Sequence, residues 1–186
     1  MSPAPLRVTV IGLGYVGLPL AVALARSFAT TGCDLDARRI DELRAGHDRT
    51  GEVAGDRLAA SGLRLTVDAA ECPPADFYIV TVPTPVDAGN RPDLSLVCAA
   101  SRTVAGLLAA AVADGRRPVV IYESTVYPGV TEDICGPILA AGSGLACGRD
   151  FFLAYSPERI NPGDREHTID KITKVVSGQT PEVLER

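Results

Sequence analysis

The sequence has 186 residues, enough for one domain with a substantial core. Hydrophobic residues make up 46% and charged residues 22%, a globular composition that excludes a disordered or fibrous chain. The formal net charge is -5 and the pI is near 5.0. Because no run of Lys and Arg is long enough to follow a phosphate backbone, we expect no nucleic-acid partner.

The cysteines are odd in number, scattered and free of any C-x-x-C pair, which indicates reduced thiols in a cytoplasmic protein: Cys33, Cys72, Cys98, Cys135 and Cys147. An apolar run at 8–25 follows Arg7 and superficially resembles a membrane span or a signal peptide. Three glycines interrupt that run at the spacing of a dinucleotide-binding turn, so we expect no membrane segment. No metal site is predicted.

Short apolar runs alternate with helical patterns along the whole chain. We expect strands at 6–11, 28–34, 63–67, 76–82, 118–122, 151–155 and 173–177. We expect helices at 15–26, 36–45, 57–61 and 131–140, and a long one capped by Asp93 and ended at Gly115. The alternation predicts an α/β fold, a Rossmann-type doubly wound and mostly parallel sheet with helices on both faces.

The motif GLGYVG at 12–17 follows the first expected strand and opens the first expected helix. Gly12 allows a tight turn, Gly14 lets the backbone approach a pyrophosphate, and Gly17 lets helix and strand pack closely. The helix N-terminus would face the phosphates. A packed strand–helix turn without a ligand stays open as the alternative.

Asp34 ends the second expected strand about 20 residues after the glycines, where a carboxylate can accept hydrogen bonds from a ribose. It would also repel a 2′-phosphate, so NAD is favoured over NADP. Arg38 and Arg39 are residues that can hold such a phosphate, whereas Asp36 adds a second negative charge against it.

Three later motifs narrow the choice: VPTP at 82–85, ESTVYPG at 123–129 and SPERINPGD at 156–164. With the glycine motif they resemble, in order and along essentially the whole chain, the nucleotide-sugar 6-dehydrogenases of the UDP-glucose/GDP-mannose dehydrogenase family. SPERINPGD is similar to the branch that acts on UDP-N-acetylglucosamine or UDP-N-acetylgalactosamine. The UDP-glucose branch has a second glutamate four residues after the one matched by Glu158, and this chain has Pro162 there.

The resemblance implies NAD contacts at Gly12, Leu13, Gly14, Tyr15, Val16, Gly17, Asp34, Arg39, Thr84, Pro85 and Thr125. It also implies nucleotide-sugar contacts at Arg159, Ile160 and Asn161.

Thr125 and Glu158 are the candidate catalytic residues, because a carboxylate in this loop can orient a water for hydrolysis. Alternatives stay open: turn chemistry for Thr84 and Thr125, and an ion pair of Glu158 with Arg159 or Arg165. Glu123, beside Ser124, either contributes to the site or only anchors its loop.

The family oxidises a sugar C6 alcohol to a carboxylate with two NAD, through a thiohemiacetal and a thioester on a cysteine. That cysteine lies beyond the matched region, and none of the five cysteines takes its place. We therefore expect residues 1–180 to be an NAD-binding domain and residues 181–186 to begin a helix that leads to an absent substrate domain.

The resemblance implies a homodimeric enzyme of surface polysaccharide biosynthesis, of which this chain alone would be inactive and could be a monomer. Two other readings stay open. One is a free-standing NAD-binding or regulatory module without turnover. The other is a 2-hydroxyacid-type dehydrogenase that shares only the Rossmann half.

Overall fold

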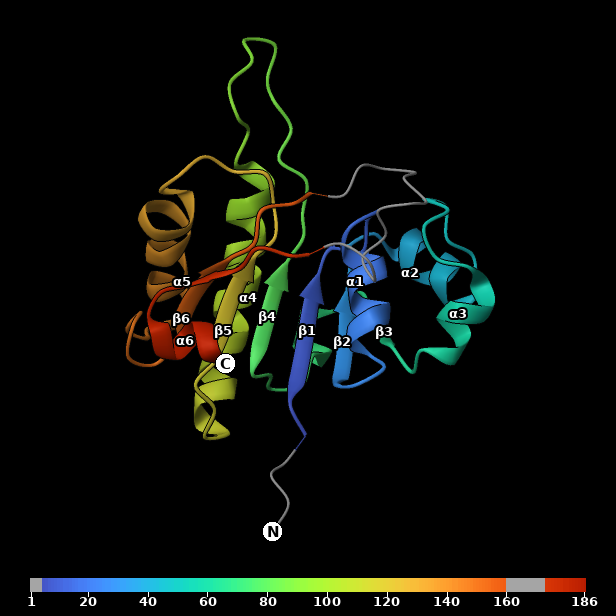
Figure 1. Cartoon of the computed structure of the whole chain (residues 1–186), viewed down its shortest axis with the longest axis horizontal. Coiled ribbons are helices and arrows are strands. Elements are labelled where there is room, and N and C mark those ends of the chain that lie inside the picture. Colours follow the sequence, from blue (N-terminus) through green and yellow to red (C-terminus); the bar gives the residue numbers. More distant parts are fainter. Residues whose placement is uncertain (1–4, 160–172) are drawn as a thin grey trace.

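A seven-stranded sheet forms the centre of the molecule in the computed structural model, which describes residues 5–159 and 173–186 (Figure 1). Its order is β3-β2-β1-β4-β5-β6-β7. The strands are β1 (Arg7–Ile11), β2 (Ala29–Cys33), β3 (Arg64–Thr66), β4 (Phe77–Val80), β5 (Val119–Tyr122), β6 (Phe152–Tyr155) and β7 (Ser177–Gly178). Strands β1 to β6 pair in parallel, which confirms the expected Rossmann-type sheet.

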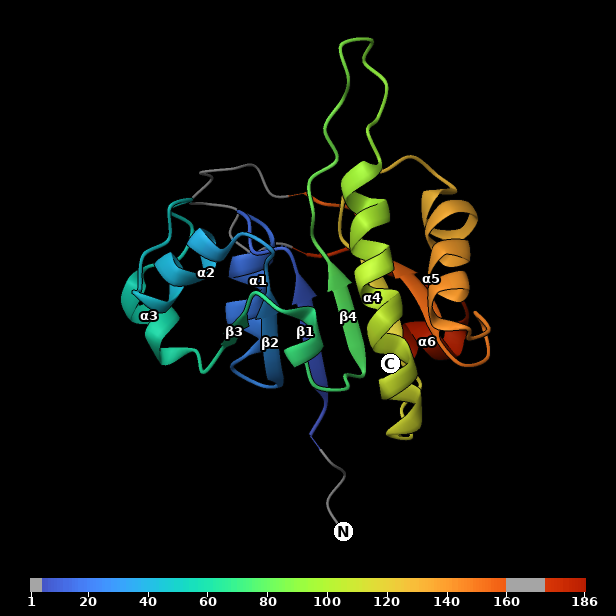
Figure 2. The same cartoon turned by 180° about the vertical axis from the view of Figure 1, so that it is seen from behind.

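Helices cover both faces of the sheet: α1 (Gly17–Leu24), α2 (Ala37–Arg44), α3 (Gly55–Ala60), α4 (Ser95–Ala113), α5 (Gly136–Ser143) and α6 (Pro181–Glu185). Figures 1 and 2, which view opposite sides, show α1 and α6 on one face and α4 and α5 on the other. The described residues also include a 3-10 helix at Ala69–Glu71 and a π-helical turn at Val130–Cys135.

Alternating side chains of the strands make the two cores. Tyr78 and Val80 of β4 pack with α4 and α5, whereas Ile79 packs with α1. Val119 and Phe152, on the face opposite α4, pack against Val183 of α6. Successive residues of a strand point to opposite faces, so a parallel sheet covered on both sides needs the near-continuous apolar runs that this sequence has.

Three expected elements differ from the observed ones. Only Ser177 of the strand expected at 173–177 is extended; with Gly178 it forms β7, which pairs antiparallel with Ala154 and Tyr155 of β6. The helix expected at 131–140 begins as the π-helical turn and becomes α-helical only at Gly136. The helix expected at 15–26 is confined to α1, because the residues before Gly17 form the glycine turn.

Helix α4 is the most apolar long helix, and by length and composition alone it could cross a membrane. Its residues Val97, Val104 and Leu108 are fully buried in the core that α4 shares with β4, β5 and α5. This burial is typical of the core helix of a globular domain. The N-cap residue of α4 is Leu94 and not the expected Asp93, whose carboxylate accepts a hydrogen bond from the Ser95 amide (2.8 Å) at the first residue of the helix.

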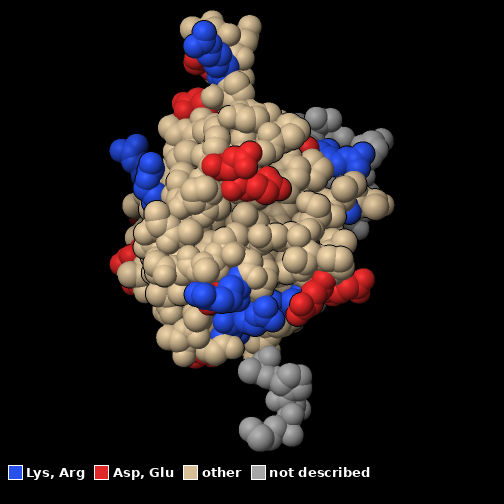
Figure 3. All heavy atoms as spheres, turned by 90° about the vertical axis from the view of Figure 1, so that its left-hand side faces the viewer, with Lys and Arg blue, Asp and Glu red and all other residues tan. Residues whose placement is uncertain are grey.

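Charged side chains stand in separate groups on the face that Figure 3 shows. Blue and red groups are divided there by broad areas of other residues. Helix α5 itself carries no charged residue. This face therefore has no continuous basic track of the kind that binds a phosphate backbone.

Among the described glycines, the least room for a side chain is at Gly17, the first residue of α1. A Cβ added at Gly17 would stand 2.0 Å from the carbonyl oxygen of Gly12 and 2.3 Å from Thr81 Oγ1. Backbone cannot yield to such a contact as a flexible side chain can, so only glycine lets α1 lie this close to the sheet.

We expect Gly17→Ala to lower the free energy of unfolding by about 1–3 kcal/mol or more, because overpacking displaces α1 from β1. Gly106→Ala is the matched control, since Gly106 lies exposed in α4 with no atom within 4 Å of an added Cβ. That control should gain about 0.5–1 kcal/mol from helix propensity. Thermal unfolding followed by circular dichroism measures both, and equal stability of the two variants would contradict the close approach.

Candidate functional site

A cavity of about 620 Å³ opens at the carboxyl ends of β1, β2, β4 and β5. Strand β1 pairs with β2 on one side and with β4 on the other, and the chain crosses back from β3 to β4, so the cavity lies where the strand order reverses. Doubly wound sheets bind their ligands at this switch point. Its wall consists of residues from the glycine turn, the ends of β2 and β4, the loop after β5, the N-terminal part of α4, and Glu158.

The glycine turn forms one side of the cavity. Gly12 has a φ of +93°, and its carbonyl oxygen accepts a hydrogen bond from Thr81 Oγ1 (2.7 Å). Gly14 is exposed, and an added Cβ there would have no atom within 4 Å. The amides of a helix's first turn have no partner within the helix. The turn therefore leaves open space in front of main-chain donors, which is the shape that a pyrophosphate needs.

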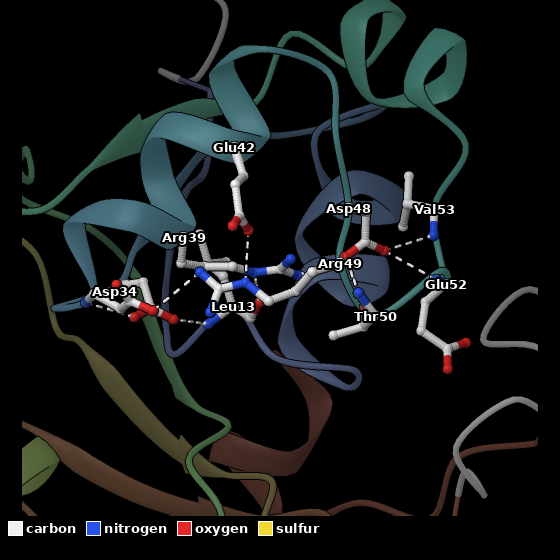
Figure 4. A network of polar contacts seen from close by, with 10 residues as sticks. Leu13, Asp34, Arg39, Glu42, Asp48, Arg49, Thr50, Glu52 and Val53 are labelled. Atoms are coloured by element: carbon white, nitrogen blue, oxygen red, sulfur yellow. Dashed lines mark hydrogen bonds and ion pairs between the residues drawn. The ribbon is translucent and has the colours of Figure 1, made fainter.

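Asp34 lies at the end of β2 and also lines the cavity. Its Oδ2 accepts a hydrogen bond from the Leu13 amide (2.8 Å), and its Oδ1 accepts one from the Asp36 amide (2.9 Å). Figure 4 shows the carboxylate held against the glycine turn. Asp34 is thus fixed beside the turn, at the strand end where this fold places a carboxylate for a ribose.

Arg39 differs from the sequence expectation, which gave it a direct cofactor contact. It is only 4% exposed and does not line the cavity. Its Nε donates to the Leu13 carbonyl oxygen (2.8 Å), and its Nη2 lies 2.7 Å from Asp48 Oδ1 (Figure 4). The guanidinium supports the turn from beneath.

Asp48 is a residue that sequence reasoning missed. Its carboxylate accepts hydrogen bonds from the amides of Thr50, Glu52 and Val53 and from the Thr50 hydroxyl. Burial would raise the pKa of Asp48, but the bonds from Thr50, Val53 and Arg39 outweigh it and lower the pKa below the usual value. The only signal in the sequence is an aspartate followed by turn-forming residues, in a stretch without clear periodicity.

The two threonine loops contact each other. Thr84 Oγ1, after β4, donates to the carbonyl oxygen of Thr125, after β5 (2.6 Å). Ser124 Oγ donates to the Val82 carbonyl oxygen (2.9 Å), which ties the same loops a second time. Both threonines line the cavity, and Thr125 is exposed. The Thr84 hydroxyl therefore has a structural contact as well as a place on the cavity wall.

Acidic side chains lie at the far end of the cavity from Asp34. Glu123, after β5, is 5% exposed and forms an ion pair with Lys174. Burial raises the pKa of Glu123, Lys174 opposes that shift, and the nearby carboxylate of Glu158 adds to it. Glu158 Oε1 accepts a hydrogen bond from the Arg159 amide (2.7 Å).

The structure brings most of the sequence-predicted residues to this one cavity: Gly12, Gly14, Tyr15, Val16, Asp34, Thr84, Pro85, Thr125 and Glu158. Leu13, Gly17, Arg39 and Arg159 do not line it, and Leu13 packs inward with 0% exposure. Ile160 and Asn161 lie outside the described residues. Sequence reasoning missed Leu96, Ala99 and Thr103 of α4. The sequence indicates their place only in that α4 follows the loop that begins with VPTP. Among the described residues, no group of three or more His, Cys, Asp or Glu is arranged to hold a metal.

Comparison with known sequences gives a family match over residues 6–186, to the UDP-glucose/GDP-mannose dehydrogenase family, NAD binding domain. Protein CapL of Staphylococcus aureus is 50% identical over 179 residues, which are 96% of this chain and 41% of that protein. The UDP-N-acetyl-D-glucosamine 6-dehydrogenase of Pseudomonas aeruginosa is 48% identical, over 97% of this chain and 42% of that protein. The chain thus spans about two-fifths of the length of these relatives.

Solved structures agree with this match. The UDP-D-ManNAc dehydrogenase of Pyrococcus horikoshii superposes with a TM-score of 0.82 at 30% identity, covering 97% of this chain and 43% of that one. The UDP-glucose dehydrogenase of Pyrobaculum islandicum gives 0.84 at 26% identity, covering 99% of this chain and 43% of that one. The shared architecture confirms the fold expected from the sequence.

We expect Gly14→Val to abolish NAD binding and to leave the domain folded. The added side chain meets no protein atom, so it fills only the space in front of the turn amides. Fluorescence titration measures the binding, and circular dichroism shows whether the fold persists. Unchanged affinity in the folded variant would sink the assignment of the turn to the pyrophosphate.

We also expect the domain to bind NAD at least about tenfold more tightly than NADP, because the Asp34 carboxylate repels a 2′-phosphate. Asp34→Asn should narrow that preference. Asp41→Asn, at an exposed aspartate of α2 that does not line the cavity, is the control and should keep it. Calorimetric titration with both nucleotides decides, and equal affinity of the unaltered chain for the two would refute the role of Asp34.

Proposed function

Because the chain belongs to the UDP-glucose/GDP-mannose dehydrogenase family and is its NAD-binding domain, we propose that the whole protein is a UDP-N-acetylhexosamine 6-dehydrogenase. It oxidises the C6 alcohol of the sugar to a carboxylate and reduces two NAD per sugar. The proposal rests chiefly on one observation: the glycine turn and Asp34 share a single cavity with Thr125 and Glu158. The SPERINPGD motif and the 48% identity to a UDP-N-acetyl-D-glucosamine 6-dehydrogenase support the acetamido-sugar class.

The cavity has a cofactor end, formed by the glycine turn and Asp34, and a chemical end, formed by Thr125 and the acidic residues. The amides of the turn face the pyrophosphate, and Asp34 accepts hydrogen bonds from the ribose. Pro85 and the threonines Thr84 and Thr125 line the part of the cavity nearest the acidic end. NAD, when bound, supplies the hydride acceptor. Arg159, Ile160 and Asn161 are proposed to contact the nucleotide-sugar.

Glu158 is proposed to orient the water that hydrolyses the acyl intermediate, with Thr125 beside it. Its position at the end of β6 and its place on the cavity wall support this role. One of its oxygens is already held by the Arg159 amide, which limits rotation of the carboxylate.

The acyl intermediate requires a nucleophile, which in the family is a cysteine. Cys33 is the only cysteine among the described residues that lines the cavity, and it lies beside Asp34, away from the acidic end. Its contact with Cys72 and its burial raise the pKa of the Cys33 thiol, so it stays protonated and is a poor nucleophile. We therefore assign the nucleophile to a part of the protein beyond residue 186.

The same proposal covers the biological setting. The whole protein acts in the cytoplasm as a homodimer and supplies uronic acids for surface polysaccharide. Residues 1–180 form its NAD-binding domain, and residues 181–186 begin the connection to the substrate domain. A free-standing NAD-binding module is the second candidate, and it differs in having no turnover at any length of chain.

The 186-residue chain should bind NAD and yet not reduce it when UDP-N-acetylglucosamine or UDP-N-acetylgalactosamine is added, because it lacks the nucleophile. The whole protein should reduce two NAD per sugar under the same conditions. Absorbance of the reduced nicotinamide measures both. Turnover by the short chain would overthrow the division into two domains, and an inactive whole protein would favour the module.

In the whole protein, Glu158→Gln should slow turnover by about 100-fold or more and cause a covalent sugar adduct to accumulate, because the amide keeps the shape but loses the charge that orients water. Mass spectrometry of the acid-quenched variant detects the adduct. Undiminished turnover without an adduct would leave Glu158 as a loop-shaping residue.

A further inference from the structure

Leu13 stands in the middle of the glycine turn, and side chains from outside the turn fix its backbone on both sides. Its amide donates to Asp34 Oδ2 (2.8 Å), and its carbonyl oxygen accepts from Arg39 Nε (2.8 Å). Its own side chain is buried, and a Cβ added at Gly32 of β2 would stand 2.9 Å from Leu13 Cδ2. Leu13 is therefore held at its amide, at its carbonyl oxygen and at its side chain.

The bond from Arg39 also sets the direction of an amide on the cavity wall. The Leu13 carbonyl and the Gly14 N–H belong to one peptide unit, which is planar and trans, so the two groups point in opposite directions. Arg39 does not line the cavity, whereas Gly14 does. A carbonyl fixed toward Arg39 therefore turns the Gly14 N–H to the opposite side, as a turn that receives a phosphate requires.

Arg39 in turn is oriented by Asp48. Its Nη2 lies 2.7 Å from Asp48 Oδ1, and the two side chains are only 5% and 1% exposed (Figure 4). A guanidinium is rigid and planar, so one contact at Nε and another at Nη2 fix the whole group. Without the carboxylate, Arg39 would be a buried cation that lacks its charged partner. Moving out to solvent would relieve that cost and release the Leu13 carbonyl oxygen.

Asp48 is itself fixed by the loop that follows it. Its Oδ1 accepts from the amide (3.0 Å) and the hydroxyl (2.7 Å) of Thr50. Its Oδ2 accepts from the amides of Glu52 (2.9 Å) and Val53 (3.0 Å). Val53 is buried in the same core as the apolar side chains of α1. The carboxylate is therefore a rigid anchor, joined to the core and not to the cavity.

Stability alone does not account for this arrangement. A buried ion pair contributes little net free energy, because desolvation of both charges offsets their attraction, and apolar side chains of similar volume serve a core equally well. What the pair adds is a fixed direction for its hydrogen-bonding groups. From Arg39 that direction leads to the backbone of the cofactor turn.

We propose that Asp48 is a positioning residue for the cofactor: through Arg39 it holds the peptide between Leu13 and Gly14 in the orientation that presents the Gly14 amide to the pyrophosphate of NAD. Asp48 does not line the cavity, so its effect on binding passes through the two contacts of Arg39. Arg39 is then a positioning residue as well, and not a contact of the nucleotide.

The first test measures the Kd of NAD for the 186-residue chain by calorimetric titration. Asp48→Asn keeps an oxygen for the loop amides and loses the charge that holds Arg39. It should weaken NAD binding by about 5–30-fold, because NAD must then order a backbone unit that is already fixed in the unaltered chain. Circular dichroism at the titration temperature shows that the variant is folded.

Val53→Ala is the matched control, since it alters the same loop and keeps the amide that donates to Asp48. Loss of buried methyl groups should lower the midpoint of thermal unfolding. The Kd of NAD should stay within about twofold of the unaltered chain, because the contacts of Arg39 are untouched. The pair of variants thus separates positioning from general loss of stability.

A double-mutant cycle tests whether Asp48 acts through Arg39. Arg39→Met and the double variant Arg39→Met/Asp48→Asn should weaken NAD binding by the same factor, within about twofold. The double variant has lost both charges of the pair, so it should fold even if a single substitution does not. Effects of the two substitutions that multiply, or full NAD affinity in the folded double variant, would overturn the proposal.

Amide hydrogen exchange without nucleotide reports on the turn directly. In Asp48→Asn the Leu13 amide should exchange about tenfold faster or more, because the turn opens locally. The amide of Val10, in the middle of β1, is the internal reference and should keep its rate. Equal exchange at Leu13 in the two proteins would show that the turn does not depend on Asp48.

The remaining outcomes are distinct. Unchanged NAD affinity in folded Asp48→Asn makes the ion pair purely structural and overturns the proposal. Tighter binding of NAD or NADP by that variant also overturns it, because the released Arg39 would then contact the nucleotide itself. An unaltered chain that binds no NAD overturns the assignment of the cavity to the cofactor, and this inference with it.

Discussion

The contact between the Gly12 carbonyl oxygen and the backbone at Gly17 is the constraint on which the rest of the cavity depends. No Cβ fits at Gly17, since it would stand 2.0 Å from that oxygen. The Gly12 oxygen also accepts from Thr81 Oγ1, which joins the turn to the end of β4. One backbone group thus sets the distance of α1 from β1 and the position of the loop that carries Thr84. The cavity has its shape because these three segments meet there.

Buried charge supports both ends of the cavity, in different ways. At the cofactor end, Arg39 and Asp48 form a pair that also has main-chain partners, so neither charge lacks compensation. Such a pair fixes a turn without reacting. At the acidic end, Glu123 forms an ion pair with Lys174. Burial raises the pKa of Glu123, Lys174 opposes that shift, and Glu158 adds to it.

The sequence predicted the parts of the structure that local pattern determines. The strands β1 to β6 follow from apolar runs, and the glycine turn and Asp34 follow from spacing, so the cofactor end was foreseen. It did not predict that Arg39 turns inward, because its partners are a carbonyl 26 residues earlier and Asp48, in a stretch without periodicity. The ion pair of Glu123 with Lys174 joins residues 51 apart. Contacts of this kind depend on which segments the fold brings together, which no local pattern contains.

The cavity wall has a further consequence for how a dinucleotide is held. Among the residues that the structure describes, no Lys or Arg lines the cavity. Main-chain amides and the dipole of α1 can meet the charge of a pyrophosphate there, and they act only at short range and in one geometry. Two of the nearby arginines are already engaged, Arg39 by Asp48 and Arg49 by Asp36 and Glu42.

The engagement of Arg39 also bears on the predicted preference for NAD over NADP. A 2′-phosphate beside Asp34 would need a cation. Arg39, one of the two arginines that the sequence offers there, instead lies beneath the glycine turn and donates to the Leu13 carbonyl oxygen. Asp34 in turn accepts from the Leu13 amide. Leu13 is therefore held at its carbonyl oxygen by the buried Arg39 and at its amide by the Asp34 carboxylate. Moving Arg39 toward a 2′-phosphate would release the Leu13 carbonyl oxygen and with it the turn, so Arg39 cannot hold such a phosphate while the turn is intact.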